Sequence, residues 1–68
     1  MTSPEKAAQA ATMLRAQLQN RPWLQLVDIG VGRDASHFVR VHVARLTPEV
    51  RSKIPNTVNG VHVWVGGL

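Results

Sequence analysis

The chain contains no cysteine and no tyrosine, and its only aromatic residues are two tryptophans and one phenylalanine. Without cysteine it can form neither a disulfide framework nor a thiolate zinc site, and it has no thiol nucleophile. A domain of this size buries only about 60% of the surface that its unfolded chain exposes, and many small domains rely on such cross-links. Its stability must therefore come from a compact layered core or from self-association.

Acidic residues are also scarce, with four Asp and Glu against eight Lys and Arg, a formal charge of +4. The four carboxylates are scattered and offer no acid–base pair. Asp34, Ser36 and His37 lie together in an extended segment, where neighbouring side chains point apart and cannot form a relay. We therefore expect a protein that is not an enzyme.

The excess of positive charge has two interpretations. A basic domain can bind an acidic partner such as nucleic acid. However, the six arginines are spread along the whole chain rather than gathered in one run. An ordinary solvated surface that happens to favour arginine explains that distribution better.

Long apolar runs are missing as well, and no stretch approaches the roughly 20 residues that span a bilayer. The opening segment Met1-Thr2-Ser3-Pro4-Glu5-Lys6 lacks the basic start of a secretory signal. Together with the absence of cysteine, these features favour a cytoplasmic location and no membrane partner.

The first part of the chain predicts a helix over residues 4–20. Ser3 can cap it, Pro4 suits its first turn, and Glu5 complements its dipole. Apolar residues then recur at helical spacing, and most of them are alanines, which would let the helix approach a sheet closely. Pro22 ends the pattern, since the residue before a proline avoids the helical conformation.

After Pro22 the period changes to two, which is typical of strands with one buried face. The alternation predicts strands over about 24–32, 37–45 and 61–65. Thr47 and Pro48 predict a short helix over 48–53. Asn59-Gly60 is a turn signal before the last strand. The residues expected to point inward are Val27, Ile29, Val31, Val39, Val41 and Val43.

These elements predict a single domain over residues 1–68 of the α+β class, a two-layer αββαβ fold. The N-terminal helix would cover one face of a three-stranded sheet. The second strand and the third are joined by roughly 15 residues, which is long enough for a crossover. The third strand could lie beside either strand of the hairpin.

Two patterns point weakly to cofactors. Residues 30–35 match the G-x-G-x-x-A dinucleotide fingerprint, but a strand pattern follows where the mechanism requires a helix N-terminus. His42 and His62 could hold a metal with Asp28 only if their strands are adjacent and in register. Surface histidines are the commoner outcome, so we expect no cofactor and no metal.

The face of the sheet opposite the valines is the candidate binding surface. Its predicted partner-binding residues are Phe38, Arg40, His42, His62 and Trp64. Aromatic rings and arginine on a strand surface suit protein contacts. They also suit single-stranded nucleic acid, whose bases stack on the rings. Alternatively, Phe38 and Trp64 could pack under a loop or against a second copy of the chain. The unpaired edge and the apolar strip together predict a homodimer with Trp64 near the contact.

The chain ends in Gly66-Gly67-Leu68, which resembles the Gly-Gly tail of ubiquitin-like carriers. Those carriers end on the second glycine and open with a β-hairpin, whereas here Leu68 follows and a helix comes first. We therefore expect a flexible tail, with the carrier function as a less favoured alternative.

Five segments together resemble a small bacterial module, which occurs alone or before trypsin-like serine protease domains. They comprise a V-x-x-G-V-G strand in Val27–Ser36, a V-x-V strand in Val39–Val43, and the L-T-P-E turn of Leu46–Arg51. Ile54-Pro55 and the G-V-x-V ending in Val58–Val63 complete the set.

The resemblance implies an accessory domain, and it transfers no catalytic residue. Such modules often carry a small polar residue before the first strand, where this chain has Trp23. The sequence as a whole thus predicts a non-catalytic protein-interaction or regulatory module, one form of which is a pro-segment-like accessory to a protease. A basic single-stranded nucleic-acid-binding module is the alternative.

Overall fold

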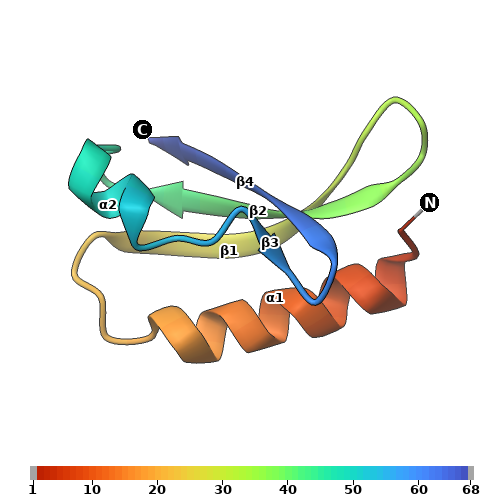
Figure 1. Cartoon of the computed structure of the whole chain (residues 1–68), viewed down its shortest axis with the longest axis horizontal. Coiled ribbons are helices and arrows are strands. Elements are labelled where there is room, and N and C mark those ends of the chain that lie inside the picture. Colours follow the sequence, from red (N-terminus) through yellow and green to blue (C-terminus); the bar gives the residue numbers. More distant parts are fainter. Residues whose placement is uncertain (1, 68) are drawn as a thin grey trace.

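The computed structural model describes residues 2–67 and shows an N-terminal helix packed on one face of a mixed four-stranded sheet (Figure 1). Its elements are α1 (Pro4–Leu18), β1 (Leu24–Val31), β2 (His37–Val43), α2 (Pro48–Ser52), β3 (Thr57–Val58) and β4 (Val61–Gly67). The predicted α+β class is confirmed. The predicted three-stranded αββαβ layout is wrong, because a further short strand precedes the last one.

The strand order is β1-β2-β4-β3. β1 and β2 form an antiparallel hairpin, and β4 lies parallel to β2 after the connection that contains α2. β3 then pairs antiparallel with β4 across a two-residue turn, in which Asn59 and Gly60 have φ values of 51° and 77°. This is the geometry of a tight hairpin turn, and it explains the Asn-Gly signal. A strand of two residues is too short to show a period, so the sequence pattern missed β3.

Helix α1 begins as expected and ends earlier. The Ser3 hydroxyl accepts a hydrogen bond from the Lys6 amide at 3.2 Å, and Pro4 occupies the first turn. The helix stops at Leu18 because Gln19 is extended and Asn20 is left-handed, with φ of 70°. Within residues 2–67 neither helix is long and apolar enough to cross a membrane.

The core lies between α1 and the facing side of the sheet. Its fully buried members include three alanines and Leu14 from α1, against valines from β2 and β4. Small alanine side chains let the helix backbone approach the sheet closely. Val31 was expected to join this core but is 60% exposed, because the hairpin end of β1 and β2 projects away from α1 (Figure 1).

The last strand continues further than its valine pattern suggested. Gly66 pairs with His42 and Gly67 with Val43, so both glycines belong to β4. The expectation of a flexible tail is therefore wrong for these two residues. Leu68 lies outside the described residues.

Candidate functional site

The face of the sheet opposite α1, called the outer face below, is built from three cross-strand rows. The register places Leu26, His42 and Gly66 in one row and Asp28, Arg40 and Trp64 in the next. In the third row Gly30 lies opposite Phe38, whose ring centroid is 6.1 Å from that of His62. The five residues predicted to bind a partner (Phe38, Arg40, His42, His62 and Trp64) are thus brought together on this face.

Asp28 and Arg40 form the polar centre of the outer face. The Arg40 guanidinium donates two hydrogen bonds to the Asp28 carboxylate, at 2.9 and 2.8 Å, in a bidentate pair. His42 Nε2 lies 3.5 Å from the same carboxylate. The hydrogen bond from Arg40 lowers the pKa of Asp28 below its ordinary value, and the same bond raises the pKa of Arg40. The one arginine on this face is therefore neutralised by its neighbour.

The two large rings lie against glycines of the sheet itself. A Cβ placed on Gly30 would come within 2.7 Å of Phe38 Cζ, so only glycine leaves room for the ring. The Trp64 indole occupies the corresponding space over Gly66. His42 meets Trp64 edge-on, with the ring centroids 5.6 Å apart. Each ring thus contacts a glycine and has an imidazole as a neighbour, which gives the face a defined shape.

The sequence had offered a covering loop as one way to hide Phe38 and Trp64. The structure differs, because Trp64 keeps 42% of its surface exposed while Phe38 is half-buried by its own sheet. His62 is exposed as well. A second copy of the chain over these rings stays a prediction.

Sequence reasoning missed Leu26 as a member of the outer face. A bulge between Leu24 and Leu26 places Leu26 opposite His42, where it is 53% exposed. The signal was present in the strand's period, because Leu26 precedes the outward-facing Asp28 by two residues. Leu26 and Trp64 are the two large exposed hydrophobic side chains that the outer face carries.

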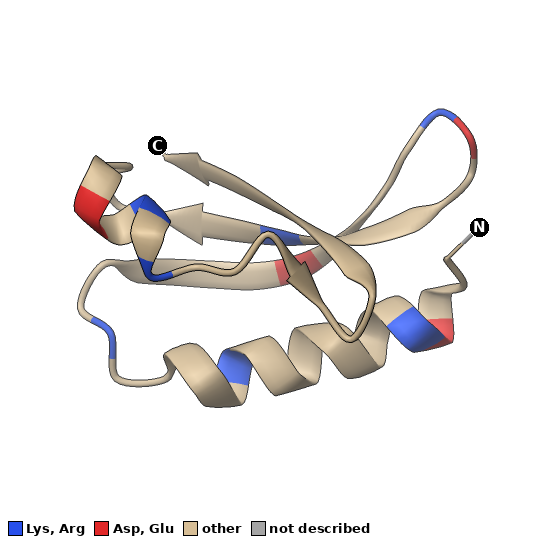
Figure 2. Cartoon of the chain, viewed as in Figure 1, with Lys and Arg blue, Asp and Glu red and all other residues tan. Residues whose placement is uncertain are grey.

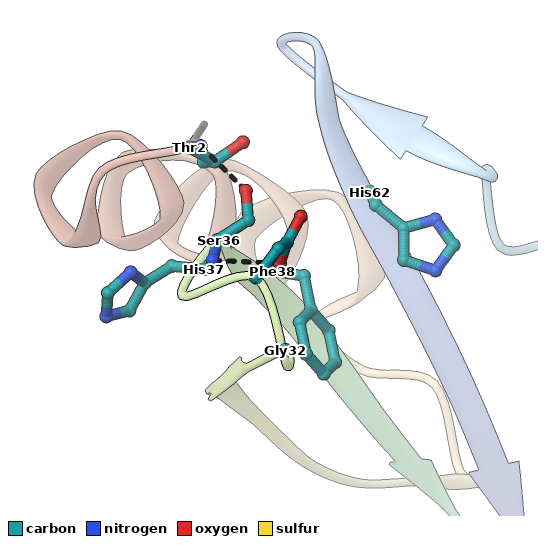
Figure 3. A pocket seen from close by; sticks show the side chains of 7 residues that line it. Thr2, Gly32, Ser36, His37, Phe38 and His62 are labelled. Carbon is teal, nitrogen blue, oxygen red and sulfur yellow. Dashed lines mark hydrogen bonds between the residues drawn. The ribbon is translucent and has the colours of Figure 1, made fainter.

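A pocket of about 240 Å³ opens where the outer face meets the β1–β2 hairpin (Figure 3). It is lined by Thr2, Gly32, Asp34, Ser36, His37, Phe38 and His62. The Ser36 hydroxyl accepts a hydrogen bond from the Thr2 amide, and the Asp34 carboxylate accepts one from the Ser36 amide. Asp34 and Ser36 therefore stabilise the turn rather than form a relay, and Ser36 fastens Thr2 to it. In Figure 3 the His37 ring points away from that of His62.

The two cofactor patterns acquire structural roles. Gly30 and Gly32 lie in β1 and its hairpin, and β2 follows them where a dinucleotide site would need a helix. His42 and His62 are on adjacent strands, but the described residues contain no group of three or more side chains placed to hold a metal ion.

The basic residues do not gather on the outer face. Figure 2 shows Lys and Arg distributed over α1, the hairpin loop, β2 and the region of α2. Arg15 and Arg51 donate to backbone carbonyls, of Val27 and Ile54 respectively. Much of the positive charge thus supports the fold or lies away from the aromatic rings.

No protein-family model matches this sequence, and comparisons with curated proteins and with solved structures give no significant match.

Proposed function

We propose that the chain is a non-catalytic protein-interaction module that binds a partner protein on its outer face. The observation that carries this proposal is the arrangement of the two rings, each lying over a glycine, with Trp64 exposed on the outer face and Phe38 half-buried beside it. Rigid aromatic side chains lose little conformational entropy on binding, and tryptophan and arginine are the commonest anchors of protein interfaces.

Charge favours a protein over nucleic acid as the occupant. The Arg40 guanidinium is engaged by Asp28, so the centre of the face has a paired ion and a carboxylate that repels phosphate. Binding of single-stranded nucleic acid requires unpaired cationic side chains beside the rings, where they contact the phosphate backbone. Nucleic acid remains the rival function because the net charge is +4 and two rings are available for stacking.

Because the sequence resembles modules that precede trypsin-like serine protease domains, a protease domain is the first class of partner to test. An accessory role would need only a shape-complementary surface and no catalytic group. The proposal is thus a regulatory or pro-segment-like contact, made by the outer face on a folded protease domain.

The test is a comparative capture experiment with three immobilised chains. The wild type and Met13→Ala should retain the same partner, because Met13 is even more exposed than Trp64 (52% against 42%) but lies on α1, away from the outer face. Trp64→Ala should lose it, since removal of a central interface tryptophan typically costs about 2 kcal/mol or more, roughly 30-fold in affinity. Equal capture by all three chains, or capture of polynucleotide alone, would overturn the proposal.

A further inference from the structure

The free edge of β1 exposes backbone groups at two defined residues. β1 is the terminal strand of the sheet, so one of its edges has no neighbour among residues 2–67. The Gly32 amide donates to the Ser36 carbonyl across the hairpin at 2.9 Å, so the Gly32 amide points toward β2. The Val27 carbonyl accepts a hydrogen bond from the Arg15 guanidinium at 3.0 Å, so this carbonyl points toward the open edge. Backbone direction alternates along a strand, so Ile29 and Val31 present their N–H and C=O groups to the open edge.

Only one half of this edge is protected. At the Leu24 end, the bulge interrupts the strand and Arg15 occupies the Val27 carbonyl. Bulges and charged side chains are the usual devices that prevent edge pairing. The half from Ile29 to Val31 has neither device, nor a proline, and Val31 is 60% exposed. This half is therefore a short, apolar pairing site.

We propose that two copies of the chain associate through this site, with their β1 strands antiparallel. The backbone groups that remain free determine the register, because the Val27 carbonyl already accepts a hydrogen bond from Arg15 and Arg33 lies in the turn. Ile29 then pairs with the partner's Val31, and Val31 with the partner's Ile29, each pair exchanging both backbone hydrogen bonds. The two-fold axis passes between the two copies of Gly30, as an isologous contact requires.

The register is also compatible with the side chains around the axis. Gly30 meets its own copy where antiparallel strands come closest, and Asp28 lies opposite the partner's Gly32, so no like charges face each other. Because Phe38 lies on Gly30, pairing brings the two Phe38 rings side by side across the axis. The two sheets become one, and their outer faces form a continuous surface. The dimer contact is thus at Ile29 and Val31 rather than near Trp64, and it does not depend on the proposed function.

Sedimentation equilibrium of the full chain, from micromolar to millimolar concentration, tests this contact with a matched pair of variants. Val31→Pro removes an N–H group that the hairpin does not use, and edge strands tolerate proline. We expect it to weaken the dimer at least about tenfold. Val31→Thr keeps the N–H group and the branched shape, and should stay within a few-fold of the wild type. A wild-type chain that remains monomeric throughout, or a dimer that Val31→Pro leaves intact, would overturn the proposal.

Amide hydrogen exchange of the wild type gives a second readout that does not depend on how the proline variant folds. The amides of Ile29 and Val31 should exchange freely in dilute solution and become protected as the concentration rises. The Asp28 and Gly30 amides, which face β2, should be protected at every concentration. Amides of Ile29 and Val31 that stay unprotected in the concentrated sample would exclude pairing at this edge.

Discussion

The Phe38 ring lies on the backbone of Gly30, the residue directly opposite it on β1. This contact gives the glycine a role that the strand pattern alone does not show. A glycine in a strand usually weakens it, and an aromatic ring placed across from it compensates by covering the exposed backbone. The contact also fixes the ring's position, which makes the outer face a defined surface.

The positions of the two rings can be measured directly in solution. Protons that lie beneath an aromatic ring are shifted upfield by its ring current. We therefore expect strong upfield shifts for the Hα protons of Gly30 and Gly66, and an ordinary value for Gly32, which has no ring beside it. Phe38→Leu should return only Gly30 to its ordinary position, and Trp64→Leu only Gly66. Ordinary shifts for both glycines in the wild type would show that the rings are not held there.

The pair of Asp28 and Arg40 makes part of the stability dependent on pH. The hydrogen bond from Arg40 lowers the pKa of Asp28 from its ordinary value of 3.8 in the folded state. Because the pKa of Asp28 is lower in the folded state than in the unfolded chain, ionised Asp28 stabilises the fold at pH values above the pKa of the unfolded chain. This contribution is lost as the pH falls through the pKa of the folded state. Thermal unfolding should show a drop in midpoint below about pH 4.

Asp28→Asn supplies the control for that measurement. The variant should be less stable than the wild type at neutral pH, and the difference should shrink as the pH falls below 3.8, since protonation then removes the same charge from the wild type. A gap between the two chains that stays constant from pH 7 to pH 2 would contradict the assignment.

The hairpin turn between β1 and β2 contains a residue in a conformation that side chains disfavour. Ala35 has φ of 63°, in the left-handed region, and its amide donates to Gly32 to close the turn. Ala35→Gly should raise the free energy of unfolding by about 0.5–1 kcal/mol, because glycine adopts this conformation without the steric cost. Ala8→Gly, at an exposed position of α1, should lower it by about 1 kcal/mol. Chemical denaturation measures both, and a loss of stability in the first variant would refute the turn's geometry.

The sequence predicted the main elements because their signals are local. Ser3, Pro4 and Thr47 begin the two helices, and the alternating valines identify β2 and β4. Features that depend on tertiary context were missed. Val31 follows the inward pattern but lies beyond the cover of α1, and the glycines near the C-terminus gave no indication that β2 would pair with them.

The candidate site was predicted in its membership but not in its internal contacts. Strand parity places Phe38, Arg40 and His42 on one face, and the same rule applies to His62 and Trp64. Parity does not give the register between strands, so the pairing of Arg40 with Asp28 and the seating of Phe38 on Gly30 could be learned only from the fold. Nor did it reveal the bulge next to Leu26.

The central claim is that the outer face binds a protein, and the two tryptophan side chains report on it most directly. Trp64 lies on the outer face, whereas Trp23 is half-buried against the core before β1 and serves as an internal control. The measurement is a ¹⁵N correlation spectrum of the labelled chain during titration with the protein recovered by capture. We predict that the Trp64 indole signal and the amides of Phe38 and Arg40 shift, while Trp23 and the exposed face of α1 do not. Shifts confined to Trp23 and α1, or a Trp64 signal that responds to single-stranded oligonucleotide and not to the protein, would contradict the account.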